Sequence, residues 1–363
     1  DSLIAQNEWD SAMTVFERTL EFEERRFGRS DSTVDVKFYR DGVSYRQYYR
    51  SFAEADSLYS RLADISTRLY GDSGGETALS LRKLGAVKVA LGQYQEAESV
   101  FRRALSASEG AFGEESGEVA EILNDLGDVT LTLARYDEAD SIARRAERIA
   151  SRILGDEHPE VARSLQIMGG VMLGRSLYSR ADSVFTMALA ILEGRLGFEH
   201  ADVAACLCQL GASHQHTNEF VKAESELKRS LEMRERIFGK EHVEVAASLK
   251  ALGIYYHQIF WLCSESESLF VRAIDILTRT YGSSHPFVAM TELSLSTTTM
   301  GLGRYDQAEI IVSRALGTLE KTFGEIHPEV ATALSVLAQI KRHVNQPSES
   351  IPLLDRAAGI LRA

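Results

Sequence analysis

Five histidines recur in the sequence at nearly equal spacing, and histidine often moves protons or binds zinc near neutral pH. They are His158, His200, His242, His285 and His327. Consecutive histidines are 42 or 43 residues apart. In a repeated structure they would form a ladder with rungs about 10 Å apart, the separation of packed helices. A shared zinc ion needs closer ligands. We therefore expect each histidine to be a polar residue near the start of a helix in its own repeat.

Other motifs of catalysis are incomplete. His214 and His216 are two residues apart, so they do not share one helix face and do not form a His-Glu-x-x-His zinc motif. The glycine-rich stretch 71–75 has no lysine to bind phosphate, and we interpret it as a loop. A nucleophile–base set is not visible either. We therefore expect a protein that is not an enzyme, with no catalytic residue, no metal site and no cofactor.

A glycine that follows Phe, Leu or Tyr returns along almost the whole chain with a period of 42 or 43 residues. These glycines are Gly28, Gly71, Gly113, Gly155, Gly197, Gly239, Gly282 and Gly324. Self-similarity at a period of this size is typical of a solenoid, in which each repeat packs only on its neighbours. The fold class therefore favours a binding surface over a catalytic centre.

Each repeat reads as two helices. In the unit 158–197, Leu165, Met168 and Met172 follow a helical spacing, and Pro159 suits the first turn of that helix. A second helical pattern covers about 178–195, and the glycine after it is typical of a helix C-terminus. A small residue recurs in the first helix and a bulky one opens the second, so we expect the bulky side chain to fill the gap beside the small one.

The phrases Leu-Asn-Asp-Leu-Gly at 123–127 and Arg-Tyr-Asp-Glu-Ala at 135–139 carry a family resemblance. They resemble the tetratricopeptide repeat, and the 42-residue period with His-Pro-Glu-Val-Ala resembles its kinesin light chain type. The resemblance implies an all-α fold, a right-handed superhelical solenoid of about nine antiparallel helix hairpins over residues 1–363. We expect this single solenoid domain to be a segment of a longer protein.

Composition narrows the partners and the location. The net charge of −13 argues against nucleic acid, which attracts basic surfaces, and against an anionic membrane. Apolar runs stay shorter than a membrane span, and residues 1–20 lack a secretion signal. The three cysteines, Cys206, Cys208 and Cys263, show no disulfide framework and favour a reducing compartment. We therefore expect a cytoplasmic protein whose partner is a protein or a peptide.

The resemblance also implies where that partner binds. In this architecture the first helix of each pair lines a concave groove, and exposed positions around the small residue contact a peptide. We predict peptide binding by Arg82, Asn124, Asp128, Gln166, Gln215, His216, Lys250, His257, Gln258 and Arg342. Cys208, Thr297, Ser335 and His343 hold similar positions. The family's peptide-contacting asparagine has a counterpart only at Asn124. The alternative is that these residues are merely solvated helix faces.

Two irregular segments interrupt the repeat. The apolar run 259–263 is either a docking knob or a turn that tucks inward with Leu262 in place of the usual tyrosine, and we favour the second. The stretch 36–50 is basic and aromatic, which suits an acidic peptide or a phosphate group, or else packing against a neighbouring unit.

Three functions fit these observations. The first is an interaction scaffold that holds a peptide or partner domain in its concave groove. The second is a sensor or regulatory arm of a larger protein, with a fused protease or kinase domain outside residues 1–363. The third is a structural solenoid that associates with itself through its ends.

Overall fold

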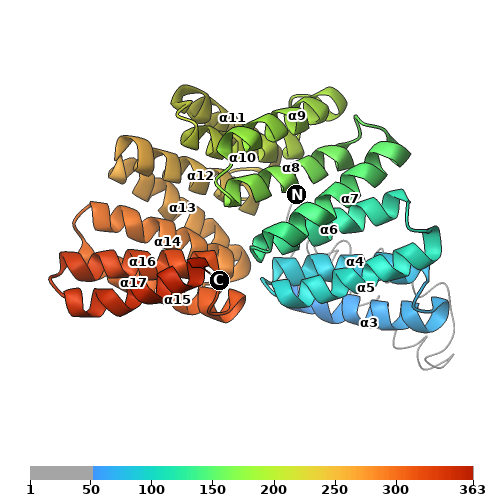
Figure 1. Ribbon diagram of the computed structural model, residues 1–363, viewed down its shortest axis with the longest axis horizontal. Coiled ribbons are helices and arrows are strands. Elements are labelled where there is room, and N and C mark those ends of the chain that lie inside the picture. The colour runs from blue at the N-terminus through green and yellow to red at the C-terminus, as the bar shows by residue number, and fades with distance from the viewer. Residues whose placement is uncertain (1–51, 363) are drawn as a thin grey trace, which may run out of the picture.

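The computed structural model of the protein describes residues 52–362, and this part of the chain consists of fifteen α-helices without a β-strand (Figure 1). The helices are α3 (Phe52–Tyr70), α4 (Gly75–Ala90), α5 (Tyr94–Phe112), α6 (Gly117–Thr132), α7 (Tyr136–Leu154), α8 (Pro159–Gly174), α9 (Tyr178–Leu196), α10 (Ala201–His216), α11 (Phe220–Phe238), α12 (Val243–Phe260), α13 (Cys263–Tyr281), α14 (Pro286–Gly301), α15 (Tyr305–Phe323), α16 (Pro328–His343) and α17 (Pro347–Arg362). From α4 onward they pair into seven hairpins, and α3 packs on α4. The aromatic stretch 36–50 lies outside the described residues.

Histidine and glycine set the ends of the helices, as the sequence predicts. The Nδ1 atom of His158 accepts a hydrogen bond from the backbone N–H of Glu160 and so caps α8. The other four histidines of the ladder cap α10, α12, α14 and α16 in the same way. Each second helix from α5 to α15 ends at a glycine with φ between 82° and 95°, a conformation that glycine adopts without steric cost.

In α4, α8 and α12 the small residue allows a phenylalanine ring of the partner helix to approach. A Cβ atom added to Gly85 would lie 2.5 Å from Cε1 of Phe101, and one added to Gly169 would lie 2.5 Å from Cε1 of Phe185. Close contact of this kind fixes the distance between the two helices. The ring comes from the middle of the second helix, so our expectation that the bulky opening residue fills this gap is wrong. Tyr94, which opens α5, packs elsewhere.

The first helices lie on the inner side of the curve. Successive first helices contact each other, as α6 with α8 and α10 with α12 do, whereas no two second helices make more than slight contact in the described residues. This difference in spacing bends the stack toward the first helices. The α4, α6, α8, α10, α12, α14 and α16 series therefore forms the inner face, and the second helices form the outer face.

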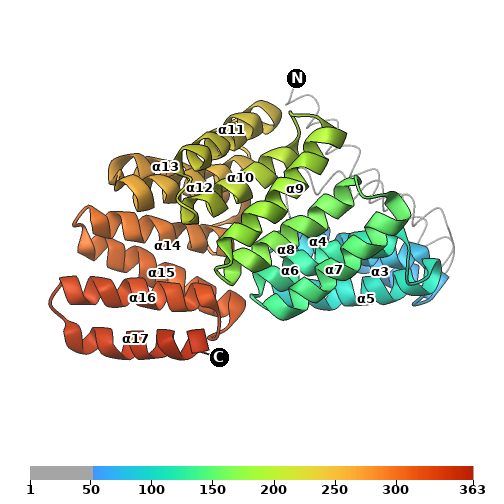
Figure 2. The ribbon, with the colours of Figure 1, turned by 45° about the horizontal axis from the view of Figure 1, so that its top comes forward.

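The curve closes on itself. The C-terminal hairpins return beside the N-terminal ones, and both views show α14 and α16 next to α4 and α6 (Figures 1 and 2). The Nε2 atom of His285 lies 3.1 Å from the carbonyl oxygen of Ala90, 195 residues away in the sequence. The ring of Tyr94 stacks on that of Phe323 with centroids 5.4 Å apart. One apolar cluster, with Tyr94 and Phe323 among its members, spans the closure.

The apolar turn between α12 and α13 does not tuck inward, contrary to our expectation. Trp261 has φ 53° in the left-handed region, and its side chain is 72% exposed. Leu262 is 39% exposed and precedes the helix as its N-cap. Cys263 occupies the first helical position, where Tyr94 stands in α5. The extra residue of this repeat is accommodated in the helix, because α12 has 18 residues where α8 has 16, while the turn that follows is one residue shorter.

Candidate peptide-binding face

Charged side chains of α4, α6 and α8 form a network on the inner face, which we call the inner-face cluster. It consists of Arg82, Glu121, Asp125, Asp128 and Arg163. Arg82 pairs with Glu121 and Asp125, and Arg163 donates to Asp125 and Asp128, both at 2.7 Å. Two guanidinium groups thus cross-link the first helices of three successive hairpins through three carboxylates. Such a network holds charged groups in fixed positions on the inner face.

Burial and neighbouring charge compete within this cluster. Burial opposes the charge on Arg163, but the carboxylates of Asp128 and Asp125 outweigh it and raise the pKa of the guanidinium. Burial raises the pKa of Asp128, against the influence of the Arg163 charge. The two residues therefore depend on each other for their charged states. Removing either one would leave its partner poorly compensated.

Lys250 on α12 is a cation of a different kind. It is half-buried, and it has no ion pair or hydrogen bond within residues 52–362. Burial lowers its pKa, and the charges of Glu329 and Cys208 only partly oppose that effect. Glu329 lies at the start of α16, two hairpins further along the array. An ammonium group in this position lacks the carboxylate that would compensate its burial.

Asn124 does not face solvent. Its side chain is fully buried, its Nδ2 donates to the Glu160 backbone and side-chain oxygens at 3.0 and 2.8 Å, and its Oδ1 accepts from Ser164 at 2.7 Å. The amide therefore joins α6 to α8. In this arrangement it stabilises the stack of repeats and presents no free group to a peptide.

The remaining predicted residues differ in exposure and in partners. Gln166 donates to Gln209 at 2.9 Å, and Gln215 is buried. His216 is exposed and stacks on Tyr178 with centroids 4.3 Å apart. Gln258 and Arg342 are exposed. The predicted set thus spreads over most of the inner face and does not converge on a single pocket.

His257 lies at the edge of this face. Its Nδ1 is 3.8 Å from the sulfur of Cys263, and its ring is tilted against Trp261 at 5.7 Å. Burial lowers the pKa of the imidazole. Three of the similar positions named from the sequence also have partners close by. Thr297 and Ser335 donate hydrogen bonds to backbone oxygens of their own helices, and His343 stacks on Tyr305.

Sequence reasoning missed several members of the inner-face cluster. Glu121 and Asp125 were not among the predicted residues, although with Asp128 they follow the spacing i, i+4, i+7 of one helix stripe. Arg163 holds the position of Glu121 one repeat later. An acidic stripe beside an arginine in the next repeat is a signal that the sequence already contains.

Residues 50–110, 118–194, 202–260 and 288–363 match the family model for the tetratricopeptide repeat. The matched segments cover most of the sequence and include, wholly or for the most part, every described helix except α13. The chain belongs to the tetratricopeptide repeat family. The period of 42 residues and the glycine and histidine helix ends are therefore features of a tetratricopeptide array.

Solved structures resemble this tetratricopeptide array in fold. A Rap protein complexed with Competence and Sporulation Factor superposes with a TM-score of 0.70 at 14% identity, over 98% of this chain and 96% of that chain. The Rap conjugation gene regulator of plasmid pLS20, in complex with the Phr* peptide, gives 0.64 at 12% identity, over 90% and 94%. BtubC (BKLC) from P. vanneervenii gives 0.45 at 19% identity, over 65% and 92%.

Three further findings are negative. A search of curated proteins finds no significant match to this chain. Within residues 52–362, no helix is both long enough and apolar enough to cross a membrane, and no group of three or more His, Cys, Asp or Glu side chains is placed to hold a metal ion.

Proposed function

We propose that this tetratricopeptide array is a non-enzymatic interaction scaffold of the kinesin light chain type, and that it holds an extended peptide along its inner face. The observation that carries the proposal is Lys250, a half-buried ammonium group without a carboxylate partner in the described residues. A peptide carboxylate would compensate its charge. Inner-face amides such as that of Gln166 supply hydrogen bonds to peptide groups on either side.

The relatives support the same proposal. The Rap proteins are described in complex with Competence and Sporulation Factor and with the Phr* peptide, and their superhelices span nearly the whole length of this one. Their sequences differ from it widely, so the ligand itself does not carry over. We propose the cytoplasm as the location, because the three cysteines are free thiols.

The test begins with a phage-displayed library of random peptides selected on the purified array. The selected peptide is labelled, and fluorescence polarisation gives its affinity for the original protein and for the double variant Lys250→Glu/His257→Ala. We expect enrichment of acidic peptides and a loss of affinity of at least tenfold, because charge reversal turns an attraction into a repulsion.

The matched control is Lys321→Glu at the end of α15, on the outer face, which makes the same change of charge. It is expected to leave the affinity unchanged, and circular dichroism verifies that every variant is folded. Equal affinity of the original protein and the double variant would remove the inner face as the binding site.

A further inference from the structure

Lys250 of α12 stands at a position where an earlier repeat has a hydrogen-bond donor paired with a carboxylate. Asn124 holds this position in α6, three repeats earlier, and its amide donates to the Glu160 carboxylate at 2.8 Å. Glu160 is the second residue of α8, the next first helix. The second residue of α14, the first helix that follows Lys250, is Phe287. The repeat next to Lys250 therefore has an apolar ring at the position of the carboxylate.

Phe287 is an exception among the described first helices. The other six have an acidic second residue, namely Glu76, Glu118, Glu160, Asp202, Glu244 and Glu329. A carboxylate at this place interacts favourably with the helix dipole. In α14 that interaction is missing, and so is the negative charge that would pair with Lys250.

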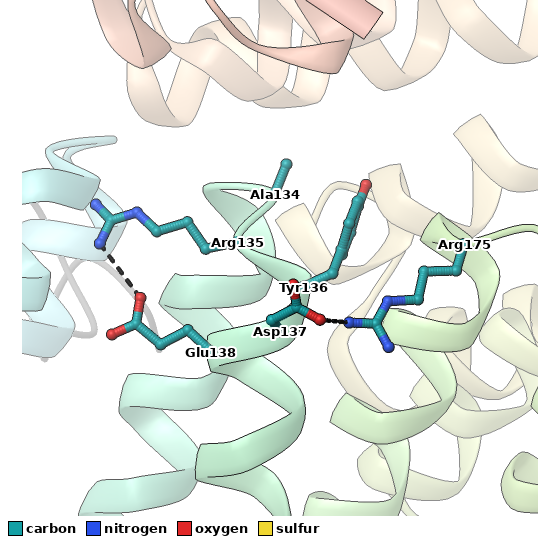
Figure 3. A pocket seen from close by; sticks show the side chains of 6 residues that line it. All are labelled: Ala134, Arg135, Tyr136, Asp137, Glu138 and Arg175. Atoms are coloured by element: carbon teal, nitrogen blue, oxygen red, sulfur yellow. Dashed lines mark hydrogen bonds and ion pairs between the residues drawn. The ribbon is translucent and has the colours of Figure 1, made fainter. Parts of the chain in front are cut away.

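Other charged groups in the array have partners. Figure 3 shows this at a recess lined by the 134–138 turn and Arg175, where Arg135 pairs with Glu138 and Asp137 pairs with Arg175. Four described lysines also pair with carboxylates: Lys88, Lys222, Lys228 and Lys341. Burial opposes the charge of these ammonium groups, but their carboxylates outweigh it and raise the pKa of each.

Lys250 shows the opposite behaviour. It has no ion pair or hydrogen bond to the part of the chain that the structure describes. Burial lowers its pKa, and Glu329 and Cys208 oppose that effect only partly. Among the described lysines it is the one whose pKa is lowered, so at neutral pH a larger share of its side chain is free amine.

A free amine on the inner face can act as a nucleophile. The fraction of free amine rises about tenfold for each unit by which a lysine pKa falls, and only this form has a lone pair for attack on a carbonyl carbon. Acylation converts the amine to a neutral amide and removes the charge that burial disfavours. At Lys88 the same reaction would instead break two ion pairs. The surroundings of Lys250 therefore favour both the reaction and its product.

We propose that Lys250 is a site of Nε-acylation by a small acyl thioester, and that acylation releases the peptide from the inner face. The Nζ lone pair attacks the thioester carbonyl carbon, a C–N bond forms, the C–S bond breaks, and the thiol leaves with the proton that nitrogen gives up. The side chain is half-buried, which favours a short acyl chain. Release of the peptide rests on the proposed function, in which a peptide carboxylate pairs with the same ammonium group, whereas the acylation itself does not.

The first test measures acylation lysine by lysine. The purified protein is incubated with S-acetyl-N-acetylcysteamine, a small acyl thioester, and mass spectrometry follows the acetylation of each lysine with time. The reference is Lys321, which is exposed at the end of α15. We expect Lys250 to react at least about threefold faster than Lys321 because of its larger free-amine fraction. Accessibility alone would favour Lys321, so equal or slower reaction of Lys250 overturns the proposed site.

The second test measures stability. Urea titrations compare the original protein with Lys250→Gln and with a protein that carries Nε-acetyllysine in place of Lys250. Both changes remove a charge that lacks a carboxylate, so we expect each to shift the folding equilibrium at least about twofold toward the folded state. A shift toward the unfolded state in both proteins would mean that the charge is compensated, which overturns the proposal.

The third test separates release of the peptide from the modification. Fluorescence polarisation with the peptide selected on the array compares Nε-acetyllysine in place of Lys250 with Nε-acetyllysine in place of Lys321, and circular dichroism verifies that both proteins are folded. We expect a loss of affinity of about tenfold for the first, the effect of losing a hydrogen bond to a charged group, and no change for the second.

The outcome for the charge reversal at Lys250 distinguishes the two proposals. If the Lys250→Glu/His257→Ala variant loses affinity but the protein acetylated at Lys250 does not, release by acylation is overturned and the proposed function stands. If neither change weakens binding, the proposed function fails and release fails with it. The acetylation rates of Lys250 and Lys321 still decide whether Lys250 is an acylation site.

Discussion

His327 joins Thr132 across one full turn of the superhelix. Its Nε2 donates to the carbonyl oxygen of Thr132 at 3.1 Å, while its Nδ1 accepts the backbone N–H of Glu329 and caps α16. Only the neutral imidazole with its proton on Nε2 makes both bonds. A helix cap and a long-range contact therefore depend on one protonation state, and His285 repeats the arrangement with Ala90.

Acid is expected to destabilise this closure. Burial lowers the pKa of His285 to about 4 and that of His327 in the same direction, although the Ala90 and Thr132 carbonyls and, for His327, Glu329 oppose the shift. The folded state then binds fewer protons than the unfolded state, so stability rises with pH in this window. We expect the free energy of unfolding to be intact above about pH 6.5 and to fall as the pH drops toward 4.

Urea titrations at several pH values measure this dependence. The control is His285→Asn/His327→Asn, which keeps a side-chain cap but removes the titrating rings. That variant should be less stable at pH 7 and should lose less stability on acidification. An unchanged acid dependence would assign the effect to other groups.

The stack of Tyr94 on Phe323 is expected to hold the closure. Both side chains are buried, and replacing a buried phenylalanine by alanine costs about 3–5 kcal/mol. We expect Phe323→Ala to open the superhelix, which small-angle X-ray scattering would record as a larger radius of gyration. Phe112→Ala changes the same position at the end of α5, where the ring is 48% exposed, and should leave the radius unchanged.

Two glycine substitutions, one in α8 and one in α9, are expected to change the stability of the array in opposite directions. Gly169→Ala places a Cβ atom 2.5 Å from the ring of Phe185 and should destabilise the array by about 1–3 kcal/mol. Gly194→Ala in α9 meets nothing within 4 Å and should stabilise it by about 0.5–1 kcal/mol. Thermal unfolding of both variants tests the prediction. If Gly169→Ala leaves the stability unchanged, the two helices can move apart at little cost.

Asn124 is expected to matter for stability. Its amide makes hydrogen bonds in a fully buried site, so Asn124→Ala should cost about 1–3 kcal/mol through the groups that it leaves unpaired. Gln166→Ala is the matched control, because that side chain is only half-buried and its hydrogen bond is to the side chain of Gln209. A stable Asn124→Ala variant with weakened peptide binding would restore the residue to the binding face.

The sequence predicted the structural features that form within a single repeat. The capping role of His158 and the positive φ of Gly197 depend on a few neighbouring residues, and the same pattern recurs in every repeat. Repetition makes such local signals easy to read. The all-α class and the hairpin within each repeat follow from them.

The contacts between distant repeats could not be predicted in this way. The pairing of His285 with Ala90 depends on how small rotations add up over several hairpins, and no local pattern encodes that sum. The inward tuck expected at Leu262 is wrong because the insertion lengthens α12 to 18 residues, and the turn after it leaves Trp261 and Leu262 exposed. Whether Lys250 finds a carboxylate partner likewise depends on neighbours from other repeats.

The closure between Ala90 and His285 also changes how the array should respond to damage. An open solenoid loses its terminal repeats one at a time, because each repeat is supported only by its neighbours. Here the two ends support each other, so fraying at α4 removes partners from α14 at once. Joining them closes a loop of 195 residues, an entropic cost that grows only slowly with length. The array should therefore unfold cooperatively, so that hairpins far apart in the chain lose their structure together.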